Sequence, residues 1–112
     1  MSKLEEKTAA YIAEAKKLKL NIDDQLLTKV TKGLGPSIYK ADAETIAATD
    51  KAEIQRLKDN FLIKKLGLKD SPELDKAIDE VIEQVGRSNK SKYRAIVYAL
   101  LVKKFKKEGI YA

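Results

Sequence analysis

The longest unbroken apolar run of the chain, Ala95–Val102, lies near its C-terminal end. A short run of this kind is typical of either a buried strand or a buried helix. The flanking residues favour a helix, because residues 88–107 contain no Gly or Pro, Ser88 is a good N-cap residue, and Gly109 stands where a left-handed residue would end the helix. The residues of this predicted helix are apolar around almost its whole circumference, which is typical of a helix buried on most sides. We therefore predict a buried central helix from Ser88 to Lys107.

Four other stretches repeat apolar residues at helical spacing and carry signals for helix ends. Ser-Pro-Glu at positions 71–73 is a typical start, with a cap residue, a proline at the first helical position and an acid in the first turn. The predicted helices run from a capping box at Ser2 to about Leu20, from Asn21 or Asp23 to Gly33, from Thr49 or Asp50 to Gly67, and from Ser71 to Gly86. Shorter helical turns are predicted around Ile38–Tyr39 and over residues 42–47.

No stretch shows the sustained alternation of apolar and polar residues that marks a half-buried strand. The predicted fold is therefore all-α: a compact bundle of five main helices plus one or two short ones, with the C-terminal helix at its centre. The 112 residues suit one domain, residues 1–112, with one hydrophobic core. Because the helices differ in length, we expect angled packing rather than a regular four-helix bundle.

Three segments resemble a bacterial family of small proteins that carry a domain of unknown function, DUF2853. They read LTKVTKGLGPSIY at residues 27–39, NFLIKKLGL at residues 60–68 and GRSNKSKYRA at residues 86–95. The resemblance extends over nearly the whole chain and implies a single small helical domain. It implies no activity, substrate or catalytic residue.

The composition argues against catalysis. The chain has no cysteine and no histidine, so it lacks thiolate chemistry and the commonest general base and metal ligand. No motif points to a metal or a cofactor, and we predict neither. The first residues lack the apolar core of a signal peptide, and the central helix is too short to span a membrane. We predict a non-enzymatic cytoplasmic protein that does not bind membranes.

The positive charge is concentrated at one end of the chain. The net charge is +6, and residues 86–112 alone carry eight basic residues and one acid, Glu108. Such an asymmetry indicates an anionic partner, either an acidic protein surface or a nucleic-acid backbone. The main candidates for the binding site precede or begin the central helix: Arg87, Ser88, Lys90, Lys92 and Arg94. The secondary candidates lie at the other end of that helix: Lys103, Lys104, Lys106 and Lys107.

Each cluster has a simpler explanation as well. Basic residues at a helix start oppose the helix dipole, which suggests a bound anion there. They would also be explained by pairing with Asp79, Glu80 and Glu83 on the preceding helix. Lysines at a helix C-terminus are what the dipole favours. A structural or homo-oligomeric protein without an anionic ligand is the alternative function, since the last two helices are highly apolar for so small a domain.

Overall fold

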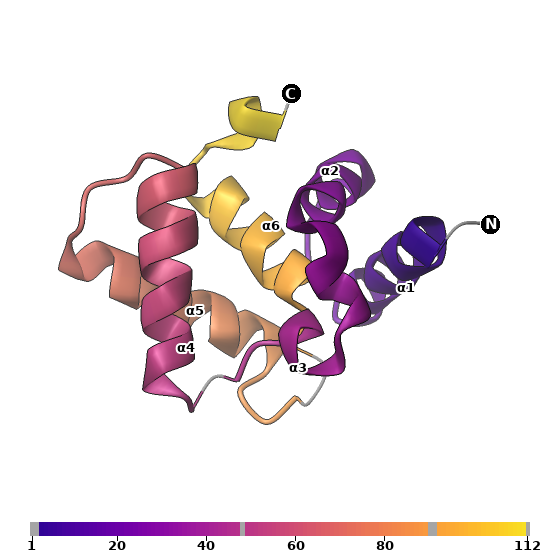
Figure 1. Ribbon diagram of the computed structural model, residues 1–112, viewed down its shortest axis with the longest axis horizontal. Helices are drawn as coiled ribbons and strands as arrows, with labels where there is room; N and C mark the ends of the chain where they lie inside the picture. The colour runs from indigo at the N-terminus through magenta and orange to yellow at the C-terminus, as the bar shows by residue number, and fades with distance from the viewer. Residues whose placement is uncertain (1–2, 48, 90–91, 112) are drawn as a thin grey trace.

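The computed structural model describes residues 3–47, 49–89 and 92–111 (Figure 1). These residues form an all-α globule measuring 41 × 31 × 26 Å, and they contain no strand. The predicted fold class is therefore confirmed. The main helices are α1 (Lys3–Lys17), α2 (Asp24–Leu34), α4 (Lys51–Arg56) with its continuation η2 (Leu57–Lys65), α5 (Pro72–Val85) and α6 (Arg94–Lys104). The short elements are η1 (Gly35–Tyr39), α3 (Ala41–Glu44) and η3 (Glu108–Tyr111).

The apolar run is at the centre of the fold, as the hydrophobic pattern predicts. Helix α6 passes through the middle of the molecule, with α1 and α2 on one side and α4 and α5 on the other (Figure 1). All eight residues of Ala95–Val102 are buried, and five of them are completely inaccessible to solvent. They form one hydrophobic cluster with side chains from every other main helix. Burial on all sides explains why this helix has no polar face.

The predicted bounds of the central helix are wrong at both ends. Helix α6 begins at Arg94 rather than after Ser88, because Tyr93, which precedes it, is held in an extended conformation. The carbonyl of Lys92 accepts a hydrogen bond from the amide of Ile46, and Thr45 and Tyr93 form an isolated antiparallel bridge. A residue in this extended pairing cannot also lie in a helix.

At its other end α6 stops at Lys104, five residues before the predicted Gly109. Lys106 takes the left-handed conformation in place of a glycine, with φ 56°. The amides of Lys106 and Lys107 donate to the carbonyls of Lys103 and Val102, which satisfies acceptors in the last turn. Gly109 instead lies within η3, which folds back over the molecule.

The start of α4 and both ends of α5 agree with the sequence signals. The Asp50 carboxylate accepts from the amides of Ala52 and Glu53 at the start of α4. Pro72 begins α5, and Gly86 ends it with φ 105°. The predicted capping box at Ser2 lies outside the described residues.

The remaining helices differ from their predicted bounds in detail. Helix α1 ends at Lys17 rather than near Leu20, and α2 ends at Gly35, with φ 65°, rather than at Gly33. Beyond Arg56, α4 continues without a break into the wider turns of η2, up to Gly67 (φ 72°). The short helix predicted over residues 42–47 is α3, which stops at Glu44.

Within the described ranges, none of these helices combines the length and the apolar content that crossing a membrane requires.

Candidate anion-binding surface

Arg87 lies just after α5 and pairs with acids of that helix. Its Nε donates to the Glu83 carboxylate at 2.6 Å and its Nη2 to the Asp79 carboxylate at 3.2 Å. These contacts raise the pKa of Arg87 above its usual value. The guanidinium is 46% exposed, so solvent screens both pairs. Two of the three acids considered as simpler partners therefore contact this residue.

Arg94 is the most extensively bonded basic side chain of the main candidates. Its Nε donates to the carbonyl of Ala43 at 2.8 Å, its Nη1 to the hydroxyl of Tyr98 at 2.9 Å and its Nη2 to the carboxylate of Glu53. Arg94 and Glu53 are each only 15% exposed. One guanidinium thus joins α3, α4 and α6, and three of its five N–H donors are used within the protein.

The remaining main candidates lie in the connection between α5 and α6. Lys92 is buried, and its ammonium group donates to the carbonyl of Asn89. Ser88 is exposed in this connection, and Lys90 lies outside the described residues. Because α6 begins at Arg94, only that residue lies in its first turn. The prediction that the whole cluster opposes the helix dipole is therefore wrong.

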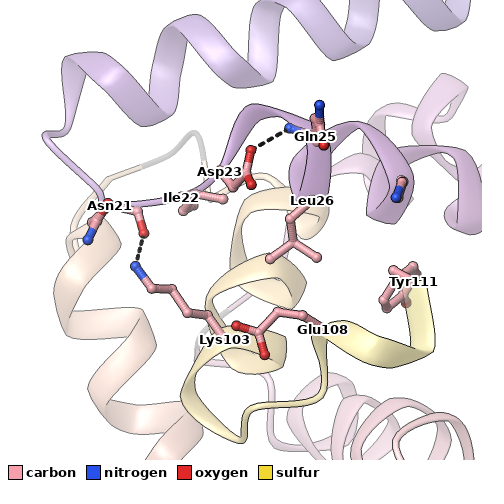
Figure 2. A pocket seen from close by; sticks show the side chains of 9 residues that line it. Asn21, Ile22, Asp23, Gln25, Leu26, Lys103, Glu108 and Tyr111 are labelled. Atoms are coloured by element: carbon pink, nitrogen blue, oxygen red, sulfur yellow. Dashed lines mark hydrogen bonds between the residues drawn. The ribbon is translucent and has the colours of Figure 1, made fainter.

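Two of the secondary candidates are also hydrogen-bonded within the protein. The Lys103 ammonium reaches the carbonyl of Asn21 in the connection between α1 and α2 (Figure 2). Lys104 pairs with Glu80 of α5. Lys106 is exposed and Lys107 is half-buried, and both precede η3. Lys103 and Lys104 are thus hydrogen-bonded within the protein although both side chains are exposed, and Lys106 is exposed just before η3.

We call residues 106–111 the C-terminal segment. The fold brings lysines from two other parts of the chain close to it, through contacts of Tyr111. The Nζ of Lys65 lies 5.4 Å from the centre of the Tyr111 ring. A Cβ atom placed on Gly33 would lie 3.4 Å from a carbon of that ring, which sets the C-terminal segment against α2. Lys29 lies four residues before Gly33 and therefore shares its face of α2, and Lys32 lies three residues after Lys29 and is its neighbour on the helix surface.

We call this region the C-terminal basic surface. Its lysines come from three separate segments, which are α2, η2 and the C-terminal part of the chain: Lys29, Lys32, Lys65, Lys103, Lys106 and Lys107.

A groove of about 410 Å³ opens on this surface (Figure 2). Leu26 projects into it from α2, Tyr111 stands at one end, and Lys103 and Glu108 also belong to its lining. Lys29 also lines it. Burial raises the pKa of Tyr111, and the neighbouring Tyr98 adds to this shift, so the phenol stays neutral at physiological pH.

The sequence patterns missed Lys29, Lys32, Lys65 and Tyr111 as members of one surface. Residues 1–85 are close to neutral as a block, so no local charge run marks these lysines. The contact between Gly33 and Tyr111 joins residues 78 positions apart, and no local pattern reports such a contact.

The fold and the charge distribution define a class: a small all-α domain with a cluster of lysines at its C-terminal basic surface. The chain belongs to the family described as "Protein of unknown function (DUF2853)", whose model matches residues 10–109. The resemblance in the sequence is thereby confirmed. No curated protein matches the chain.

Proposed function

We propose that this protein is a non-enzymatic binding domain that recognises an anionic macromolecule through its C-terminal basic surface. The single observation that carries this proposal is the convergence of lysines from α2, η2 and the C-terminal segment around Tyr111. A cytoplasmic location is part of the proposal and rests on the sequence alone.

Because the other basic residues are paired with acids, we place the proposed site at the C-terminal basic surface rather than around Arg87 and Arg94. Arg87, Arg94 and Lys104 already neutralise acids of the protein itself. A ligand that took their donors would separate those acids from these partners. For Glu53, whose side chain is largely buried, the separation would cost considerable free energy. Lys29, Lys32 and Lys106 are exposed on the C-terminal basic surface, so an anion can reach them without breaking an internal pair.

The alternative function, homo-oligomerisation without an anionic ligand, has less support. A stable homodimer interface usually has an apolar centre. Among the described side chains, the large hydrophobic ones left exposed are Tyr39 and Ile110, at 46% and 43%. They belong to η1 and η3, and single exposed apolar residues are normal on a monomer.

The proposal is tested by replacing Lys29, Lys106 and Lys107 together with Gln. Fluorescence anisotropy would measure the affinity for a labelled single-stranded oligonucleotide and for a labelled glutamate 20-mer, at about 50 and 200 mM salt. Losing three phosphate contacts should reduce the slope of log affinity against log salt by about 2 for a single strand. Lys103 is left unchanged because its ammonium holds the connection before α2.

The matched control replaces three other exposed lysines, Lys40, Lys51 and Lys76, with Gln. They precede α3, begin α4 and lie on α5, so the net charge falls equally while the C-terminal basic surface stays intact. We expect wild-type binding from this control and weakened binding from the first variant. Equal losses in both variants would mean that overall charge, not this surface, attracts the anion. No binding of either polyanion at the lower salt would overturn the proposed function.

A further inference from the structure

The groove on the C-terminal basic surface has a composition that a simple polyanion site would not have. Two ammonium groups line it, those of Lys29 and Lys103. Two carboxylates line it as well, those of Asp23 and Glu108. The groove is therefore electrically mixed, although it lies within a surface rich in lysine.

The two carboxylates differ in their structural roles. One oxygen of Asp23 accepts from the amide of Gln25 and caps α2. Glu108 is exposed in η3 and lines the groove (Figure 2). An ionised carboxylate offers about four acceptor positions. Glu108 therefore presents acceptors to any hydrogen-bond donor that enters the groove.

The bottom of the groove is apolar. Leu26 is 8% exposed, Ile22 is half-buried, and the half-buried ring of Tyr111 stands at one end. A volume of about 410 Å³ lies within the range of small-ligand sites, roughly 300–1,000 Å³. The amides of Asn21 and Gln25 add further polar groups to the lining. The groove thus suits a flat, partly apolar group that carries hydrogen-bond donors on its edge.

Charge complementarity selects among anionic macromolecules. An acidic peptide presents carboxylates, which Asp23 and Glu108 repel. A duplex keeps its bases stacked inside, so it would meet the groove with phosphates only. A single strand separates its charge from its bases: phosphates face the lysines, while an unstacked base offers a flat surface and its edge. Amino groups on that edge donate to a carboxylate, as cytosine N4 does to Glu or Asp.

We infer that the groove seats one unpaired, amino-bearing base of a single-stranded nucleic acid, with Glu108 accepting a hydrogen bond from the amino group. The neighbouring phosphates lie on the lysines of the C-terminal basic surface. This inference rests on the proposed function, because the strand is held to the protein by its charge. The groove adds a preference for the base.

The test compares labelled 12-mers of cytidine and of uridine by anisotropy at about 100 mM salt. Uridine carries a carbonyl oxygen where cytidine carries the amino group, so only the cytidine strand offers an exocyclic amino group to Glu108. We expect the wild-type protein to bind oligo(C) roughly ten to a hundred times more tightly than oligo(U), the effect of one hydrogen bond to a charged group.

The Glu108→Ala variant separates the hydrogen bond from simple electrostatics. Removing an acid from a basic surface should tighten the binding of oligo(U). Losing the acceptor should at the same time reduce the preference for oligo(C) to about onefold. Glu73→Ala, which removes an exposed acid from the first turn of α5, is the matched control and should keep the wild-type preference. Far-UV circular dichroism checks that both variants are folded.

The outcomes distinguish the two proposals. Equal binding of oligo(C) and oligo(U) by the wild-type protein, with weaker binding by the Lys29, Lys106 and Lys107 variant, would overturn the base-binding groove and leave the proposed function standing. Tighter binding of the glutamate 20-mer than of oligo(C) would likewise overturn it in favour of an acidic protein partner. Absence of binding to any of these polyanions at about 50 mM salt would overturn both.

Discussion

Replacing Arg94 with Gln tests whether this residue holds the fold together or is free for a ligand. The substitution removes the charge and the donors that reach Ala43, Tyr98 and Glu53. The variant should be clearly less stable than the wild type, because three acceptors on three elements lose the same partner. Glu53 in particular, whose side chain is only 15% exposed in the wild type, would lose the guanidinium that neutralises it.

The size of the loss follows from these contacts. Removing one member of a buried ion pair typically destabilises a protein by about 3–5 kcal/mol. The lower end of this range of free energies applies here, because Arg56 still contacts Glu53 at 3.0 Å and the Arg94–Glu53 pair keeps some contact with solvent. We expect a loss of about 3 kcal/mol of unfolding free energy. For a domain of this size, that corresponds to a decrease in melting temperature of roughly 10–15 °C.

The assay is urea denaturation followed by circular dichroism, for Arg94→Gln, Glu53→Gln and the double variant at pH 7. The interaction energy between the two positions should be about 2 kcal/mol, within the range found for residues in direct contact. Arg94→Lys is the charge-preserving control. It should recover only part of the loss, because one ammonium cannot reach three acceptors that lie in different directions.

The Arg94–Glu53 pair also predicts that the stability of the protein depends on pH. Burial by itself raises the pKa of Glu53, but hydrogen bonds from Arg94 and Arg56 outweigh it and hold the pKa below its usual value. A depressed carboxyl pKa adds stability above the unfolded-state value, about 4.3 for Glu, and this stability is lost as the pH falls through the folded-state value. The difference between the wild type and Glu53→Gln should therefore shrink as the pH falls below about 4.3.

Two results would refute this reasoning. If Arg94→Gln stays within about 0.5 kcal/mol of the wild type, the guanidinium contributes no more than an exposed side chain. Arg94 would then be available to an anion, and the surface around Arg87 and Arg94 would again be the leading site. A difference between the wild type and Glu53→Gln that stays constant down to about pH 3 would show that the carboxylate is not held ionised by its partners.

Four further variants test the fold and the site. Leu101→Ala should destabilise the protein by about 3–4 kcal/mol, because the completely buried side chain leaves a cavity in the central helix; a loss below about 1 kcal/mol in urea denaturation would contradict the central position of α6. Gly67→Ala should lower stability by about 1 kcal/mol because φ is 72°, although a Cβ meets nothing within 4 Å. Gly109→Ala, which has equal space and no positive φ, should be nearly neutral, and similar losses in both would refute the strain argument. Arg87→Gln should leave the urea midpoint unchanged, since its two pairs are solvent-exposed, and a large shift would mean that this side chain is a structural element like Arg94.

The comparison of α5 with α6 explains why some helix ends are predictable from the sequence. Pro72 and Gly86 act through their own backbone geometry, so the ends of α5 follow from neighbouring residues. Ser88 and Gly109 are the same kind of signal around α6, but this helix begins at Arg94 and ends at Lys104 instead. The strand-like pairing of residues 45–46 with residues 92–93 decides where α6 begins. That pairing is long-range, and local propensity does not contain it.

The sequence by itself determined the all-α class, the family, the burial of Ala95–Val102 and the excess of positive charge in the last quarter of the chain. These properties depend on local periodicity and composition. Only the tertiary structure decided which of the charges face solvent. Arg87 and Arg94 meet acids brought close by the fold, whereas Lys29 joins the C-terminal segment through the packing of Tyr111 against Gly33. The physical reason is that the availability of a charge depends on its neighbours in space, and a one-dimensional pattern reports only neighbours along the chain.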